Sequence, residues 1–337
     1  MPSREANKLI FASDGSAISN QQARSNQMIL GDRNLLELSG EDHKRVRNAL
    51  SSFLKPESLK QYVGKMDAEV RKHLEMHWQG KQNVTKPHLY VWLIGVAPDD
   101  TLTFNILCCL IFGIRARNPT IETRGQIPGI CIRGETNEAV ISDKRDHTQC
   151  FAYYDCTSLV RVLANDLDVY AAVLQEHEKI ATGKLPGEFQ TWEEVAKMKY
   201  RWIVALDTLR TVTPIFAVFR TALKDIEFGG YLIPKGWKIF WATSMTHMDN
   251  TIFPEPTKFD PTRFENQASI PPYCFIPFGG APQICPGIEF ARIETLVAIH
   301  HLVTRFKWKL HHTNNFFSRN PTPEPTEGLP VKIIPRA

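Results

Sequence analysis

The sequence lacks the features of a secreted or membrane-inserted chain. Its first residues, Met1 to Ala6, contain no apolar core of a signal peptide or a membrane anchor. The longest apolar run, Leu102 to Ile114, is about seven residues shorter than the ~20 that cross a bilayer, so it predicts a buried helix. The seven cysteines include no CxxC pair and no regular spacing. This pattern argues against a disulfide framework or a zinc site and favours a reducing compartment.

The chain also has little excess of one charge. Its 40 basic and 36 acidic residues give a net charge of +4 and are well mixed along the 337 residues. We therefore expect a small molecule or a protein as partner, and no nucleic acid. A hydrophobic content of 43% is ordinary for a globular chain that buries a substantial core, as one large domain or as two.

Apolar periodicity predicts a mainly α fold with small β-sheets. The clearest pattern predicts an amphipathic helix over residues 57 to 78, begun by Pro56. Residues 117 to 150 have no sustained period, which predicts an irregular segment. The Gly-Gly pair in Glu227-Phe-Gly-Gly-Tyr231 predicts a hairpin in a small sheet between residues 214 and 248. Further helices are predicted from about residue 41, over 98 to 114, from 157 to a break at Gly183, over 192 to 210 and over 286 to 306.

The strongest chemical signal is the glycine-rich segment Pro277-Phe-Gly-Gly-Ala-Pro-Gln-Ile-Cys-Pro-Gly287, which delivers Cys285 to the start of a predicted helix. Helix N-terminal amides and the positive end of the helix dipole favour a thiolate, so we expect a lowered pKa and a good nucleophile or metal ligand. Phe278 and Gly287 would let a flat cofactor approach the backbone closely. A buried cysteine alone is more often an inert core residue, and the surrounding residues favour the functional interpretation.

This segment resembles the cysteine loop of the cytochrome P450 family, Phe-x-x-Gly-x-Arg-x-Cys-x-Gly, with Phe278, Cys285 and Gly287 in register. The resemblance implies that residues 277–306 form the heme-ligand loop and the helix after it. It also implies heme (iron protoporphyrin IX) as the cofactor, bound through the thiolate of Cys285 to its iron.

Two positions of this loop depart from the family pattern. Ala281 stands where the family has glycine, and Gln283 stands where the family has the arginine that pairs with a heme propionate. A neutral amide should anchor the cofactor less strongly than a guanidinium, because charge-assisted bonds to carboxylates are the strong ones.

Two further segments resemble parts of the family that support the loop. Ala205-Leu-Asp-Thr-Leu-Arg210 resembles the Glu-x-x-Arg helix, with Asp207 and Arg210 one turn apart, where opposite charges can pair. Its acid is one methylene shorter. Phe259-Asp-Pro-Thr-Arg-Phe264 resembles the Pro-x-Arg-Phe segment, which implies that Arg263 completes a buried network of one acid and two arginines locking the cysteine loop. The alternative is an exposed ion pair that contributes little.

Three other positions resemble the family's cationic contacts to heme propionates. Arg220 follows the stretch from Pro214 to Phe219, where family members place such a contact. His43 and Arg47 match the Trp-or-His-x-x-x-Arg pattern of an N-terminal helix along the heme edge. The alternative for this pair is a solvated basic helix face.

The family activates dioxygen beside a kinked helix whose acid and hydroxyl pass protons. Phe151-Ala-Tyr-Tyr-Asp-Cys-Thr-Ser158 resembles that helix. The resemblance implies catalytic roles for Asp155 as the acid, Cys156 at the hydroxyl position and Thr157 as the second threonine. Tyr153 replaces a small residue that opens space beside the heme, so its ring is expected to narrow the groove.

The resemblance covers nearly the whole chain and implies a single cytochrome P450 domain over residues 1–337. The implied fold is truncated at the N-terminus, without the membrane anchor and first strands, and lacks internal segments, with 117–150 standing where substrate-covering helices lie. Tyr231-Leu-Ile-Pro-Lys-Gly-Trp237 and Thr246-His-Met-Asp-Asn250 resemble plant members that oxidise triterpenoids, taxoids and brassinosteroids. The family implies the cytoplasmic face of the endoplasmic reticulum. The lack of a transmembrane segment gives a soluble cytoplasmic protein as the alternative.

These resemblances imply a heme-thiolate monooxygenase that hydroxylates an apolar terpenoid or steroid with dioxygen and electrons from an NADPH-dependent reductase. The departures from the family pattern favour an alternative of another class, a shortened and non-catalytic member with weak or no heme binding. A third alternative is a zinc protein, which adjacent histidine pairs disfavour because they are not normal ligand spacing. Its ligands would be His300, His301, His311 and His312.

Overall fold

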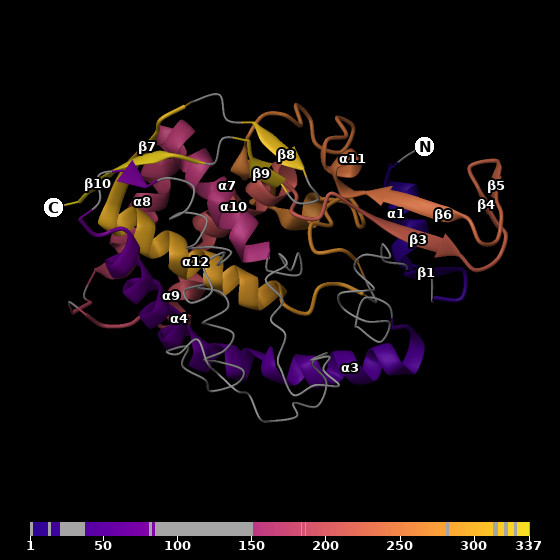
Figure 1. Ribbon diagram of the computed structural model, residues 1–337, viewed down its shortest axis with the longest axis horizontal. Helices are drawn as coiled ribbons and strands as arrows, with labels where there is room; N and C mark the ends of the chain where they lie inside the picture. Colours follow the sequence, from indigo (N-terminus) through magenta and orange to yellow (C-terminus); the bar gives the residue numbers. More distant parts are fainter. Residues whose placement is uncertain are drawn as a thin grey trace, which may run out of the picture.

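The computed structural model describes residues 3–12, 15–20, 38–80, 83–84, 151–182, 184–185, 187–280, 283–312, 316–319, 323–326 and 329–336. In this part of the chain helices predominate and small antiparallel sheets complete the fold (Figure 1), so the predicted fold class is confirmed. The α-helices are α1 (Ser3–Ala12), α3 (Gly40–Phe53), α4 (Pro56–His77), α7 (Phe151–Asn165), α8 (Leu167–Ala181), α9 (Trp192–Lys197), α10 (Lys199–Thr211), α11 (Thr243–His247) and α12 (Ile288–Arg305). The strands are β1 (Ile18–Asn20), β2 (Asn83–Val84), β3 (Ala217–Ala222), β4 (Ile226–Phe228), β5 (Tyr231–Ile233), β6 (Lys238–Ala242), β7 (Phe306–Leu310), β8 (Phe317–Arg319), β9 (Pro323–Pro325) and β10 (Val331–Pro335).

The helix predicted over residues 57 to 78 is α4, and it begins at Pro56 as expected, since proline at the first helical position loses no intrahelical bond. Two helices predicted as continuous are each broken in two. Asp166 ends α7 and caps α8, because its carboxylate accepts a hydrogen bond from the Val169 amide at 3.0 Å. Met198 leaves the helical region with φ −76° and ψ 61° and separates α9 from α10. The segments 98–114 and 117–150 lie outside the described residues.

The helix α12 forms the centre of the main core and crosses the middle of the molecule (Figure 1). It packs against α4, α7, α8 and β7. Because it is covered on most sides, it is buried nearly all round, and its buried residues include Glu294, Thr295, His300 and His301 besides the apolar ones. The apolar stripe of α4 that faces it is almost completely buried and consists of Leu59, Val63, Met66, Val70 and Leu74.

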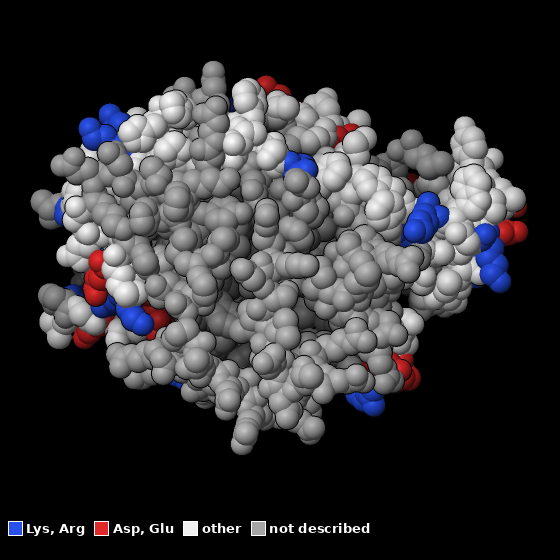
Figure 2. All heavy atoms as spheres, viewed as in Figure 1, with Lys and Arg blue, Asp and Glu red and all other residues white. Residues whose placement is uncertain are grey.

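The strands form small antiparallel sheets at two sides of this helical core. One sheet has the order β1-β3-β6 and another the order β2-β10-β7, while β4-β5 and β8-β9 are two-stranded. The predicted hairpin is confirmed as β4-β5, in which Phe228 pairs with Tyr231. Its two turn residues have positive φ, 59° at Gly229 and 80° at Gly230, the conformation of a primed hairpin turn that glycine adopts without strain. On the face shown in Figure 2, described basic and acidic residues lie side by side around the rim.

Three buried histidines predict that acid destabilises the fold. Burial, reinforced by neighbouring positive charges, lowers the pKa of His177 to about 2 and that of His247 to about 3. Burial also lowers the pKa of His300 well below its usual value. Unfolded histidine titrates at about 6.5, so above that pH these residues are neutral in both states. Below it, the unfolded chain binds protons that the folded chain does not, and stability falls.

We expect the free energy of unfolding to decrease by about 1.2 kcal/mol per histidine between about pH 6 and pH 5. Urea unfolding over a pH series measures this slope. A His177→Leu variant should reduce this loss of stability by about 1.2 kcal/mol, while His312→Leu, at an exposed position, should leave it unchanged. A stability that is constant or rises on acidification would contradict the prediction.

Candidate functional site

The cysteine loop is a closed turn that places Cys285 two residues before Gly287, the N-cap of α12. The amide of Cys285 donates to the carbonyl of Phe278 at 2.9 Å, and the amide of Gln283 donates to that of Gly280 at 3.0 Å. The turn opens at Gly279, whose φ of +75° lies in the left-handed region that glycine adopts freely. Cys285 is half-buried, and the departure at position 281 lies outside the described residues.

The pKa of the Cys285 thiol is raised, which corrects the expectation that its helix-terminal position would lower it. Burial is the largest influence and disfavours the thiolate. The backbone amide of Gly287 and the charge of Arg47 favour the thiolate and offset only part of this effect. The sequence indicated the helix terminus correctly, but the extent of burial depends on the tertiary fold.

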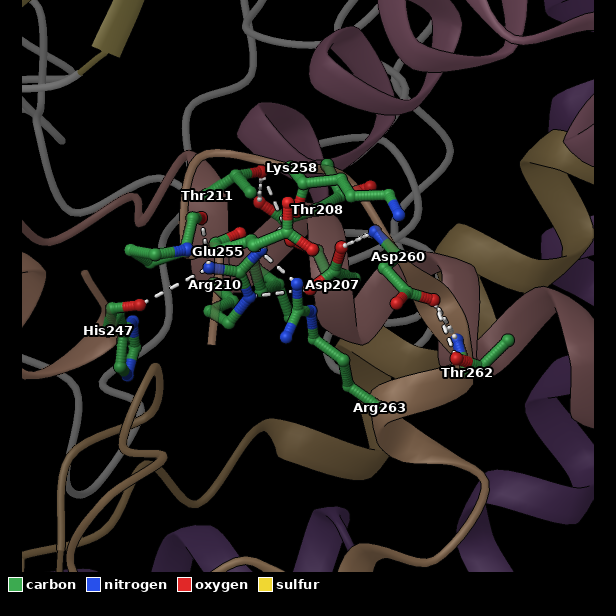
Figure 3. Close-up of polar contacts among 12 residues, drawn as sticks. Asp207, Thr208, Arg210, Thr211, His247, Glu255, Lys258, Asp260, Thr262 and Arg263 are labelled. Atoms are coloured by element: carbon green, nitrogen blue, oxygen red, sulfur yellow. Dashed lines mark hydrogen bonds and ion pairs between the residues drawn. The ribbon is translucent and has the colours of Figure 1, made fainter. Parts of the chain in front are cut away.

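Asp207 and Arg210 form a fully buried ion pair on α10, so the alternative of an exposed pair is wrong (Figure 3). The Nε of Arg210 donates to Oδ1 of Asp207 at 2.5 Å, and the other carboxylate oxygen accepts from the Asp260 amide at 2.6 Å. Burial raises the pKa of Asp207 although both hydrogen bonds act in the opposite direction. The guanidinium of Arg210 also donates to three backbone carbonyls, those of His247, Pro256 and Lys258.

Arg263 lies near this pair and bonds to backbone. Its Nη2 donates to the carbonyl of Glu255 at 3.2 Å, and among the described residues no ion pair joins it to Asp207. Its positive charge still favours the charged form of Asp207. The structure thus brings the two arginines and the acid to one place, joined partly through the backbone of the segment that precedes Arg263.

His247 connects this network to the cysteine loop, a role that the sequence analysis missed. The backbone carbonyl of His247 accepts a hydrogen bond from Arg210, and Nε2 of the His247 ring accepts one from the amide of Ile276 at 3.0 Å. The lowered pKa keeps the ring neutral, so its proton is on Nδ1, which donates to Oγ1 of Thr213 at 3.0 Å. The residue lies in a segment that resembled the family, but sequence spacing gave no sign of this contact.

The basic run on α3 divides into solvated and loop-facing residues. Arg47 is half-buried, and its Nη1 donates to the carbonyl of Ile284, next to Cys285, at 2.6 Å. His43 is buried, with a pKa lowered by burial and by Arg47. Lys44 and Arg45 are largely exposed. The alternative of a solvated basic face therefore describes Lys44 and Arg45 and does not describe His43 and Arg47.

Arg220 is a buried cation without a carboxylate partner among the described residues. On β3, it is 9% exposed, and burial lowers its pKa to about 10. Its guanidinium donates a hydrogen bond to the carbonyl of the adjacent Phe219, at 3.3 Å. A desolvated guanidinium is costly unless a counter-charge is present, so this side chain fits the carboxylate of a bound group.

We expect Arg220→Leu to separate cofactor binding from folding. Removing a desolvated charge should leave the urea midpoint of the cofactor-free protein unchanged or higher. In the heme-bound chain that the family resemblance implies, loss of a charge-assisted bond to a propionate should speed heme loss about tenfold. Transfer of heme to excess apomyoglobin measures the rate of heme loss. Arg45→Leu, at an exposed position on α3, is the control. A variant that loses stability and retains heme normally would contradict the assignment.

The residues predicted to handle oxygen lie on α7. Cys156 and Thr157 are buried, and Cys156 belongs to the main core cluster. The side chains of Tyr153 and Asp155 lie outside the described part, so the catalytic roles of these positions stay predictions.

The zinc alternative finds no support in the described residues, where no group of three or more potential ligands could hold a metal. His300 and His301 are buried and contact Gln190 and Asp67, whereas His311 and His312 are exposed.

Comparisons with known proteins agree with this geometry. The family model named Cytochrome P450 matches residues 157–331. A beta-amyrin 28-monooxygenase of Kalopanax septemlobus is 35% identical over 88% of this chain and 73% of its own length. Cytochrome P450 716A1 of Arabidopsis thaliana is 34% identical over 89% of this chain and 74% of its own length.

Among solved structures, the cyanobacterial CYP120A1 with bound retinoic acid matches with a TM-score of 0.76 and 23% identity, over 98% of this chain and 88% of that protein. The described helices include none with the length and apolarity needed to span a membrane. The curated relatives at 30% identity or more include monooxygenases and cover most of the chain. The chain therefore belongs to the cytochrome P450 family, as its cysteine loop predicted.

Proposed function

We propose that the protein is a heme-thiolate monooxygenase that hydroxylates an apolar terpenoid or steroid. The observation that carries this proposal is the position of Cys285, half-buried on a closed loop at the start of α12. A sulfur presented in this way can bond to a metal while the backbone hydrogen bonds from Gln283 and Cys285 that close the loop stay in place. Family membership supports the reaction class, and relatives named beta-amyrin 28-monooxygenase support a triterpenoid-like substrate.

The chemistry of two residues fits a heme: Cys285 has a sulfur that can bind iron, and the buried guanidinium of Arg220 has no carboxylate partner among the described residues. Bound there, heme supplies the redox chemistry that reduces dioxygen and oxidises a C–H bond. Cys285 would bind the iron as a thiolate, and coordination deprotonates a thiol outright, which overcomes the burial effect on its pKa. Arg220 would hold a propionate. Gln283 would offer only a neutral amide, so anchoring depends more heavily on Arg220 and Arg47.

The remaining roles follow from the family. Asp155, Cys156 and Thr157 on α7 would hold and pass the protons that dioxygen reduction consumes; a thiol at position 156 is a weaker donor than a hydroxyl. Electrons would come from an NADPH-dependent reductase. The cytoplasmic face of the endoplasmic reticulum is the location that the family suggests for this work.

A second candidate is a shortened, non-catalytic family member with weak or no heme binding. It is favoured by Gln283, which removes a charged contact, and by Cys156, which is packed in the main core. One experiment separates the two candidates. The purified full chain is reduced with and without carbon monoxide, and electron uptake is then compared with oxidation of a beta-amyrin-type triterpenoid.

The active candidate predicts one heme per chain, a red-shifted Soret band of the carbon monoxide complex, and electron uptake in step with product formation. A chain that purifies without heme, or that binds heme and oxidises no member of a triterpenoid and steroid panel, supports the non-catalytic candidate.

A further inference from the structure

The N-terminal helix α1 lies against the segment that leads into the cysteine loop. In Figure 1 it lies beside the β1-β3-β6 sheet, on the side from which the chain enters α12. Asn7 and Phe11, four residues apart and therefore on one face of α1, make these contacts. The sequence pattern assigned no role to either residue, and neither belongs to the network around Arg210.

Asn7 is 2% exposed, and its carboxamide joins three separate parts of the chain. Its Oδ1 accepts from the indole of Trp241 on β6 at 2.7 Å, and because an indole N–H can only donate, this contact fixes the orientation of the amide. Its Nδ2 donates to Oγ1 of Thr246 at 2.8 Å and to the carbonyl of Tyr273 at 2.9 Å. Tyr273 lies five residues before Phe278, the first residue of the cysteine-loop signature.

Tyr273 has a backbone conformation that needs such support. Its φ of +67° lies in the left-handed region, which only Tyr273 and Glu255 occupy among the described non-glycine residues. A bulky side chain is strained there, and the conformation persists only where surrounding contacts hold it. Each of the two residues has its carbonyl held by a side-chain N–H: Glu255 by Arg263 and Tyr273 by Asn7.

Phe11 contacts the cysteine loop itself, at Gly280. Its ring packs against Trp241 with the centroids 4.9 Å apart at an interplanar angle of 87°. It also lies over Gly280, where an added Cβ would come within 2.7 Å of the Phe11 side chain. Gly280 is therefore required by the close approach of α1. The helix thus touches the cysteine-loop region both before and within the turn that carries Cys285.

We propose that Asn7, assisted by Phe11, is a positioning residue that holds the cysteine loop in its metal-binding geometry. Asn7 acts by fixing the left-handed turn at Tyr273, from which the chain proceeds through Ile276 to the loop. This inference builds on the proposed heme binding by Cys285. It assigns to α1 a role in ligand geometry in addition to its role in packing.

The test is a double-mutant cycle on the full chain. Asn7→Leu keeps the size of the side chain and removes its hydrogen bonds, and we expect heme to transfer to excess apomyoglobin about tenfold faster, the effect of about one lost buried hydrogen bond. The red-shifted band of the reduced carbon monoxide complex should partly give way to a band without thiolate ligation. Tyr273→Gly makes the left-handed turn free of strain, so in that background Asn7→Leu should change the heme-loss rate only about threefold.

A matched control distinguishes positioning from stability. Val173→Ala on α8 shortens a fully buried residue of the main core, which does not include the cluster of Phe11, Trp241 and Ile276. It should lower the urea midpoint and leave both heme measurements within about twofold of the wild type. If Asn7→Leu behaves like this control, or has the same effect with Tyr273→Gly as without it, the proposal is wrong.

Two further measurements cover the other outcomes. Should Asn7→Leu fail to fold, Phe11→Leu is expected to speed heme loss about threefold, and an unchanged rate overturns the proposal. Should the wild-type chain bind no heme, the proposed function fails. Hydrogen exchange of the cofactor-free protein then tests positioning alone: Asn7→Leu should speed exchange at the amides of Gln283 and Cys285 more than at those of α8. Equal acceleration in both regions would overturn the inference.

Discussion

Arg210→Met should lower the free energy of unfolding by about 3–5 kcal/mol, the usual result of removing one partner of a buried pair. The variant leaves the Asp207 carboxylate without its cation at a position that is completely buried. It also removes the donors to the carbonyls of His247, Pro256 and Lys258. Such a loss is a large fraction of the about 5–15 kcal/mol by which a domain is usually stable, so we expect a large fall in the urea midpoint or insoluble protein.

The matched control is Arg292→Met on α12. Arg292 pairs with Glu289 three residues earlier, the same spacing as Asp207 and Arg210, but Glu289 is 51% exposed. Its loss should cost less than about 1 kcal/mol. The double variant Asp207→Asn with Arg210→Met should recover part of the stability because no unpaired charge remains. If Arg210→Met and Arg292→Met lowered the free energy of unfolding equally, burial would not be the reason that the α10 ion pair stabilises the fold.

Sequence predicted the features that depend on neighbours along the chain. The helix α4 has an apolar period and a proline start, and the β4-β5 hairpin has its Gly-Gly turn, so local signals suffice for both. The cysteine loop was recognised for the same reason, because its glycines and its cysteine lie within one short segment. Asp207 and Arg210 are one turn apart on one helix, so the shorter acid still reaches its partner.

The features that sequence missed depend on residues far apart in the chain. Asn7 and Tyr273 are separated by 266 positions, and no local pattern indicates that one holds the other. His247 has the same character, because its ring reaches Thr213 on one side and Ile276 on the other. The predicted fall in the pKa of Cys285 was wrong. A helix terminus can be recognised from the local sequence, whereas desolvation depends on everything packed around the sulfur.

These long-range contacts give the cysteine loop support from several directions. The Arg210 network reaches it through His247, α1 reaches it through Asn7 and Phe11, and α3 reaches it through Arg47. The supports hold backbone carbonyls and amides of the loop and of the segment before it. A loop held in this way keeps the sulfur in place although its thiol is disfavoured as an anion by burial.

Cys285→Ala should abolish the red-shifted Soret band of the reduced carbon monoxide complex and all oxidation of substrate. The reason is that thiolate ligation gives the family both its spectrum and its capacity to cleave the O–O bond, and a methyl group cannot bind iron. The fold should survive, because Cys285 is only half-buried and the loop is closed by backbone bonds at Phe278 and Gly280. The free energy of unfolding of the cofactor-free variant, measured in urea, should therefore stay within about 1 kcal/mol of the wild-type value.

Cys274→Ala is the matched control, since Cys274 is fully buried in the same part of the chain and its thiol also has a raised pKa. It should cost some stability through lost packing and leave the red-shifted band intact. If the two variants gave the same spectrum, or if Cys285→Ala retained the band, the iron would have a different ligand. Cys285 would then not be the metal-binding residue, because its half-buried position on the loop before α12, which the fully buried Cys274 lacks, is what assigns it that role.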